Sequence, residues 1–189
     1  YVNSSFMNKS NFQVEFSKDS LLQKIGNNAF HCSNVRTIEI PKKVTHIGKN
    51  VFSKCSNLTK AEIPLDSELQ FIGEGAFSIT KIKSLNIPSH LREIPDFMCT
   101  MSPIEKVYIS DDSEIQSIEY DAFASTKIRS FKIPRNVEYL DSFAFNHCSF
   151  LLIIEIDEDS KLKSISLSSF PSKLLLMIPA KISHIEITQ

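Results

Sequence analysis

Two His-Cys dipeptides come nearest, among the residues of this sequence, to forming a metal site. They are His31-Cys32 and His147-Cys148, and imidazole nitrogens and thiolates are both zinc ligands. A zinc ion needs its ligands at about 2 Å. The repeat described below separates the two dipeptides by about five turns, which is roughly 24 Å at the spacing of neighbouring strands. We therefore predict no metal ligand and no cofactor.

The four cysteines also fit a purely structural role. All of them lie in a corner of the repeat at or just after a recurrent Phe, where two other turns carry Thr80 and Thr126. The occurrence of Cys in some turns and Thr in others predicts a small residue packed inside the fold at this corner. A disulfide between Cys32 and Cys55 stays open as an alternative, because adjacent turns lie within the reach of a disulfide.

The remaining polar residues show no catalytic pattern. The sequence contains no Gly-rich phosphate loop, no G-x-S-x-G and no H-E-x-x-H. An Asp-Ser pair recurs, but one Asp per turn offers too few oxygen ligands for calcium, and both side chains suit a turn by bonding nearby backbone N–H groups. These pairs are Asp19-Ser20, Asp66-Ser67, Asp112-Ser113 and Asp159-Ser160. We expect no enzyme and no catalytic residue.

The elements that position these residues come from an internal repeat. Val44–Pro64 is one complete unit, with an apolar pair, a Gly, a Phe, a Cys and an I-x-I-P-like end. An Ile, or once a Leu, precedes a Phe by five residues in six units: Ile25/Phe30, Ile47/Phe52, Ile72/Phe77, Ile118/Phe123, Leu140/Phe145 and Ile165/Phe170. A seventh unit has Cys99 at the Phe position after Ile94. Self-similarity at such a period indicates a solenoid.

A second apolar column fixes the period. Its pairs are Ile38/Ile40, Ala61/Ile63, Leu85/Ile87, Val107/Ile109, Phe131/Ile133, Ile154/Ile156 and Leu176/Ile178. Its last residue recurs after 23, 24, 22, 24, 23 and 22 residues. The alternation predicts a short strand in each turn, and strands of successive turns should pair in parallel. Residues Val44–Ile47 and their copies are expected as a second short strand or an extended corner.

The segment after each Gly is too short for a stable helix, so we expect one helical or 3₁₀ turn there, with its Phe pointing inward. Residues 1–13 are polar and out of register, which predicts a frayed N-terminal segment or partial cap. The solenoid is then expected to occupy residues 14–189. No apolar run approaches the length of a membrane helix, so we expect no membrane insertion by this segment.

The columns I-x-I-P, V-x-x-I-G and A-F-x-x-C-x-x-L resemble those of the BspA-like leucine-rich repeats, most clearly over Val44–Pro64 and Ile25–Pro41. The pattern departs from this family at Cys99, at Leu140, at Ser110 and Asp157 where Pro is expected, and across Ser166–Lys173. The resemblance implies an α/β leucine-rich-repeat solenoid with a parallel short-strand ladder on its concave face, helical or 3₁₀ turns elsewhere, and about seven full turns of 22–25 residues.

The same resemblance implies a non-enzymatic protein-recognition module of a cell-surface or secreted protein, adhering to host cells or matrix proteins. An intracellular scaffold or adaptor of the same fold is the alternative. The net charge of −1 offers no basic stripe for nucleic acid. Partner contacts are expected from the outward residues of the concave strands: Thr37, Glu39, Lys60, Glu62, Ser84, Asn86, Lys106, Tyr108, Ser130, Lys132, Ile153 and Glu155. Sequons occur at Asn3, Asn8 and Asn57, and Asn57 is the candidate glycosylation site.

Overall fold

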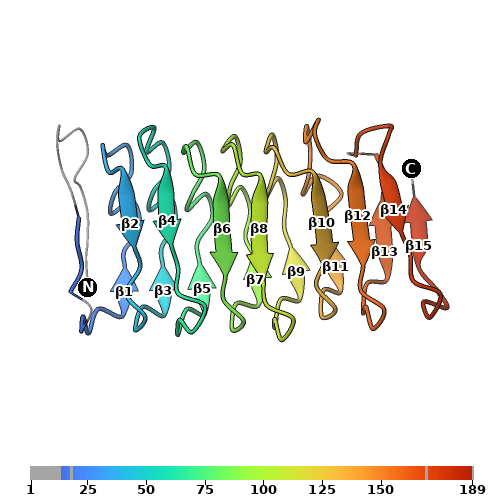
Figure 1. Ribbon diagram of the computed structural model, residues 1–189, viewed down its shortest axis with the longest axis horizontal. Coiled ribbons are helices and arrows are strands. Elements are labelled where there is room, and N and C mark those ends of the chain that lie inside the picture. The colour runs from blue at the N-terminus through green and yellow to red at the C-terminus, as the bar shows by residue number, and fades with distance from the viewer. Residues whose placement is uncertain (1–13, 18, 169, 189) are drawn as a thin grey trace.

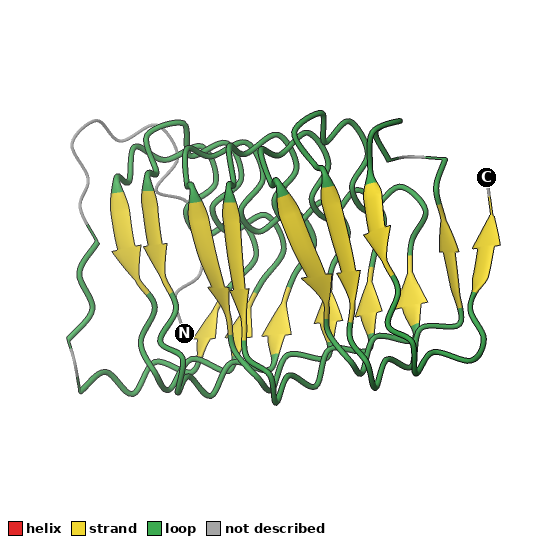
Figure 2. Cartoon of the chain, turned by 45° about the vertical axis from the view of Figure 1, so that its right-hand side comes forward, coloured by secondary structure: helices red, strands yellow, loops and turns green. Residues whose placement is uncertain are grey.

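A computed structural model describes residues 14–17, 19–168 and 170–188, which form a solenoid with two layers of parallel strands (Figures 1 and 2). We call one layer the long-strand face: β2 (Thr37–Glu39), β4 (Lys60–Glu62), β6 (Ser84–Ile87), β8 (Lys106–Ile109), β10 (Ser130–Ile133), β12 (Ile153–Ile156) and β14 (Leu175–Met177). The other is the second face: β1 (Lys24–Ile25), β3 (His46–Ile47), β5 (Phe71–Ile72), β7 (Glu93–Ile94), β9 (Ser117–Ile118), β11 (Tyr139–Leu140), β13 (Ser164–Ser166) and β15 (Glu186–Thr188).

Strands pair in parallel with the equivalent strand of the next turn. On the long-strand face Ile38 lies opposite Ala61, and on the second face Ile25 lies opposite Ile47. The predicted repeat register, the parallel ladder and the count of about seven turns are therefore confirmed. The second short strand, which the sequence left open against an extended corner, is present.

The prediction of helical or 3₁₀ turns is wrong: the described residues contain no helix. Consecutive tight turns occupy these segments instead. In the first unit the Ala29 N–H donates to the Gly26 carbonyl within the turn at 3.2 Å, whereas the Phe30 N–H donates to the Val51 carbonyl of the next turn at 3.0 Å. Because the neighbouring turn accepts alternate N–H groups, the backbone has no need of a helix to satisfy them.

These turns use a left-handed backbone at two recurring positions in each of the first five units. The first unit has φ of 58° at Asn28 and 55° at Cys32, and the third has 64° at Gly75 and 53° at Ile79. A positive φ is easy for Gly and tolerated by Asn, but it is unfavourable for a β-branched residue such as Ile79. The stacked arrangement is thus stable enough to impose this conformation on unsuited residues.

A column of stacked Phe rings fills the interior, as predicted. The ring centroids of Phe30 and Phe52 lie 5.4 Å apart, as do those of Phe52 and Phe77, and all three side chains are fully buried. The stack is interrupted at buried Cys99 and resumes with Phe123 and Phe145, again 5.4 Å apart. The column ties each turn to its neighbours, as a solenoid requires.

The serines of the Asp-Ser corners bond nearby backbone N–H groups as predicted, whereas no such bond from the paired Asp side chains is found among the described residues. The Leu69 N–H donates to Ser67 Oγ at 3.3 Å, and the Ile115 N–H donates to Ser113 Oγ at 3.3 Å. Equivalent bonds run from the Leu22 N–H to Ser20 and from the Leu162 N–H to Ser160. The predicted N-terminal segment, residues 1–13, lies outside the described residues, so that boundary stays a prediction.

Candidate functional site

The outward column of the long-strand face contains all twelve predicted contact residues. Nine of them are exposed, and Asn86, Ile153 and Glu155 are half-buried. Strand pairing sets them side by side in groups: Thr37 with Lys60, Glu39 with Glu62, Ser84 with Lys106, Asn86 with Tyr108, Ser130 with Ile153, and Lys132 with Glu155. The outward orientation is confirmed, whereas the binding role stays a prediction.

The long-strand face is not one continuous sheet. It consists of β2–β4, β6–β8 and β10–β12–β14, so no ladder joins β8 to β10. The opening exposes residues that are buried elsewhere: Val107 and Ile109 are half-buried, whereas their counterparts Leu85 and Ile87 on β6 are fully buried. The apolar side chains of β8 are therefore partly accessible beside β10.

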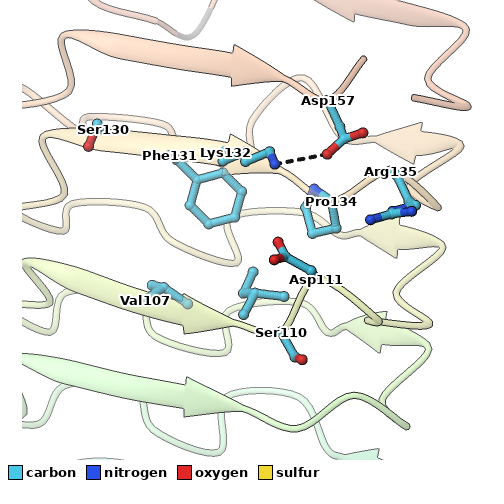
Figure 3. A pocket seen from close by; sticks show the side chains of 10 residues that line it. Val107, Ser110, Asp111, Ser130, Phe131, Lys132, Pro134, Arg135 and Asp157 are labelled. Atoms are coloured by element: carbon cyan, nitrogen blue, oxygen red, sulfur yellow. Dashed lines mark ion pairs between the residues drawn. The ribbon is translucent and has the colours of Figure 1, made fainter. Parts of the chain in front are cut away.

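A pocket of about 120 Å³ occupies the opening (Figure 3). Its apolar lining comes from Val107 and Ile109 on β8, from Phe131 on β10, and from Pro134. Its polar rim contains Ser110, Asp111, Ser130, Lys132, Arg135 and Asp157. Such a volume suits one apolar side chain, and the rim suits polar contacts around it.

An ion pair holds one side of this pocket. Lys132 Nζ lies 2.9 Å from an Asp157 carboxylate oxygen, and the Asp157 side chain is only 11% exposed. Hydrogen bonding from Lys132, supported by the backbone N–H of Asp159, lowers the pKa of Asp157. The same pair raises the pKa of Lys132, so both groups stay charged at neutral pH. Lys132 is thereby held in place beside the opening.

Sequence reasoning included Lys132 and Ser130 but missed the pocket itself. Ser110 and Asp157 on its rim are the two places noted above where the I-x-I-P pattern lacks its Pro. The missing Pro could have drawn attention to this edge of the long-strand face, because it changes the residue that directly follows β8 and β12. The missing ladder between β8 and β10 could not be predicted from the sequence, because the inward apolar residues of both strands follow the ordinary repeat.

All four cysteines are free, so the Cys32–Cys55 disulfide is absent from this structure. Cys55, Cys99 and Cys148 are buried, as predicted, whereas Cys32 is only half-buried. Burial raises the pKa of Cys99 far above its usual value. Cys55 Sγ donates to the Phe30 carbonyl at 2.9 Å, and Cys148 Sγ to the Phe123 carbonyl at 3.0 Å. These two thiols therefore act as hydrogen-bond donors inside the fold.

The His-Cys dipeptides do not converge on one another. Cys32 Sγ lies 3.5 Å from its neighbour His31 Nε2, while His147 and Cys148 belong to a distant turn. Across the described ranges, no group of three or more His, Cys, Asp or Glu side chains is arranged to hold a metal ion. Nor do those ranges contain a helix that could cross a membrane.

Asn57 is exposed, and its Nδ2 donates to Asn34 Oδ1 of the preceding turn at 3.3 Å. Its side chain is accessible at the surface, as a glycosylated Asn must be, and its modification stays a prediction. The sequons at Asn3 and Asn8 lie outside the described residues.

The stacked parallel turns and the repeat columns are those of leucine-rich-repeat proteins. Six copies of the BspA type leucine rich repeat region match residues 2–116 and 104–188. The chain therefore belongs to the BspA-type leucine-rich-repeat family. None of the curated proteins matches the chain significantly.

Solved bacterial structures share the fold. A leucine-rich repeat protein from Bacteroides ovatus is 27% identical, with a TM-score of 0.72 over 89% of this chain and 43% of that protein. The pneumococcal vaccine antigen PcpA is 23% identical, with a TM-score of 0.59 over 88% of this chain and 45% of that antigen. A leucine rich cell surface protein from Faecalibacterium prausnitzii is 24% identical, with a TM-score of 0.56 over 74% of this chain and 44% of that protein. This chain thus spans less than half the length of each.

Proposed function

We propose that the chain is a non-enzymatic protein-recognition module and that it binds its partner on the long-strand face around β8 and β10. The observation that carries this proposal is the opening between these strands, which gives the long-strand face a pocket with an apolar base. Binding energy concentrates where a partner side chain fills a well-packed pocket surrounded by polar contacts.

The residues beside the pocket suit contact with a protein. Tyr108 is 51% exposed on β8, and Lys106 is exposed on the same strand. Lys132 borders the pocket from β10, on the far side of the opening. A tyrosine ring brings a large apolar area with a polar tip, which is why tyrosine is enriched in interfaces. An apolar side chain of the partner would enter the pocket while Tyr108 and Lys106 contact its surroundings.

The proposed setting is a cell surface or secreted protein that adheres to host cells or matrix proteins. Membership of the BspA-type family and the likeness to a cell surface protein and a vaccine antigen support this setting by analogy. The intracellular scaffold remains the second candidate, and the free state of all four cysteines favours it.

The test measures binding of the purified protein to host-type cells and to immobilised matrix proteins. The variant Lys106→Ala/Tyr108→Ala/Lys132→Gln removes the proposed contacts, and the glutamine keeps a hydrogen-bond donor for Asp157. The matched control Lys24→Ala/Lys49→Ala/Phe71→Ala makes equivalent changes around the second face. Circular dichroism establishes that both variants remain folded.

Saturable binding that is lost in the first variant and kept in the control supports adhesion through the long-strand face. Binding that survives in the first variant excludes that face. The absence of binding to any cell or matrix protein would favour the intracellular scaffold, whose partners are then sought by pull-down from the source cell.

A further inference from the structure

A row of aromatic rings lies on the other side of the solenoid, just beyond the ends of β7, β9 and β11. The row consists of Phe97, Tyr120 and Phe143, one from each of three successive turns. The ring centroids of Phe97 and Tyr120 lie 5.4 Å apart, and those of Tyr120 and Phe143 lie 5.6 Å apart. Tyr120 is 42% exposed and Phe143 is 43% exposed. Three adjacent rings at the surface form an apolar patch, unlike the scattered single residues that every surface carries.

The backbone beneath the row is fixed by hydrogen bonds. The Phe97 N–H donates to the Tyr120 carbonyl at 3.0 Å, and the Tyr120 N–H donates to Asp96 Oδ1 at 3.0 Å. The Phe143 N–H donates to Asp141 Oδ1 at 2.8 Å. The rings are therefore preorganised, so a ligand would not have to order them on binding.

Four carboxylates belong to the same three turns as the rings: Glu93, Asp96, Glu119 and Asp141. Within the described residues none of them forms an ion pair, and Arg92, the basic residue next to Glu93, is paired with Glu114. Two turns before Tyr120 the arrangement differs, because Glu74 is ion-paired with Lys49. The negative charge around the aromatic row is thus left without a basic partner from the chain.

The carboxylates are close enough to affect one another. Burial raises the pKa of Glu93, and the charges of Glu119 and Asp96 raise it further. The Tyr139 hydroxyl donates to Asp141 Oδ2 at 2.9 Å, and its pKa is raised by that hydrogen bond, by burial and by the surrounding carboxylates. A cation placed among these groups would relieve their repulsion.

We propose that the aromatic row of Phe97, Tyr120 and Phe143 is a docking surface for a Lys/Arg-rich segment of a protein partner. A basic side chain would lie against an exposed ring face, and such cation–π contacts add to the attraction of the carboxylates. A wholly apolar partner would have to bury unpaired carboxylates, which is costly. This surface is separate from the long-strand face, so the inference does not depend on the function proposed above.

The test is a fluorescence anisotropy titration of the whole chain with a labelled lysine-rich peptide, at an ionic strength of about 0.02 M, where charge is weakly screened. A glutamate-rich peptide of the same length is the ligand control. Tyr120→Leu/Phe143→Leu removes two π systems but keeps apolar bulk, and Glu93→Gln/Glu119→Gln removes two charges without touching the turn bonds of Asp96 and Asp141. The matched control Glu68→Gln/Phe71→Leu changes an exposed acid and ring on a neighbouring part of the same face.

We expect the lysine-rich peptide to bind and each of the first two variants to weaken binding by roughly tenfold, while the control variant stays within about twofold. The Lys106/Tyr108/Lys132 variant should bind this peptide as the native chain does, which separates this test from the previous one. Should the double leucine variant fail to fold, the single Tyr120→Leu and Phe143→Leu variants replace it. Lack of peptide binding, equal binding of the glutamate-rich peptide, or unchanged affinity in the leucine variants would overturn the proposal.

Discussion

At the scale of single residues, the thiols show how one position of the repeat accepts different side chains for one physical reason. Cys55, Ser102 and Cys148 occupy equivalent places, and each donates to the carbonyl of a core Phe in the preceding turn. Thr80 shares the column and bonds to Ser102 Oγ at 3.0 Å. The Phe30 carbonyl also accepts the Ser33 N–H at 3.0 Å, so the Cys55 thiol is its second donor, a role that a hydroxyl or a thiol can fill. We infer that this position favours a small side chain that can donate a hydrogen bond over a small apolar one.

Replacing Cys55 distinguishes these two requirements. Cys55→Ser keeps a donor and should change the free energy of unfolding by less than about 0.5 kcal/mol. Cys55→Ala keeps the small size but removes the bond to the Phe30 carbonyl, which should cost about 1 kcal/mol. Urea unfolding followed by circular dichroism measures both. Equal costs for the two variants would mean that only the size of the side chain matters at this position.

At the scale of elements, the close stacking of turns depends on glycine in the first half of the solenoid. A Cβ atom added to Gly73 would lie 2.5 Å from the Lys49 backbone nitrogen, and one added to Gly48 would lie 2.6 Å from the Asn27 backbone nitrogen. Later turns carry Pro95, Glu119 and Asp141 at the equivalent position. Two carboxylates near the aromatic row, those of Glu119 and Asp141, therefore belong to a position where earlier turns have no side chain.

Gly73→Ala should accordingly destabilise the protein by about 1–3 kcal/mol, because the contact is with backbone that cannot move aside without disturbing the neighbouring turn. Glu119→Ala is the matched control, since a Cβ is already accommodated there, and it should cause little loss of stability. Thermal and urea unfolding of the two variants provide the comparison. A Gly73→Ala protein as stable as the native chain would show that the turns can separate at this point without cost.

At the scale of the whole molecule, the described strands pack against the equivalent strands of the turns before and after them. The stacked Phe rings also join successive turns, and the interruption at Cys99 divides them into a group ending at Phe77 and a group beginning at Phe123. In such an array stability is a sum of turns and their interfaces. A destabilising substitution in one turn should therefore lower the stability mainly of that turn and of the turns next to it.

Phe123→Ala tests this locality. Phe123 is fully buried and packs against Phe131 and Phe145, with ring centroids 5.4 Å away in both cases. The cavity left by the ring should cost about 3–5 kcal/mol. Hydrogen exchange measured by mass spectrometry should quicken over residues 99–148 much more than over residues 25–55. Uniform quickening along the chain would indicate a single cooperative unit, and a cost below about 1 kcal/mol would contradict the core role of the Phe column.

The sequence by itself determined the solenoid, its period and its inward columns, because the alternation of Ile38 and Ile40 and the recurrence of Phe30 depend on local spacing alone. It also located the Asp-Ser corners, since the bond from Ser67 to the Leu69 N–H spans two residues. Only the tertiary structure decided what depends on the neighbouring turn. The Phe30 N–H bonds to Val51 of the next turn, which is why stacked turns replace the expected helical turns. The opening beside Val107 and the row that joins Tyr120 to Phe143 likewise arise from the distance between successive turns, which no single repeat encodes.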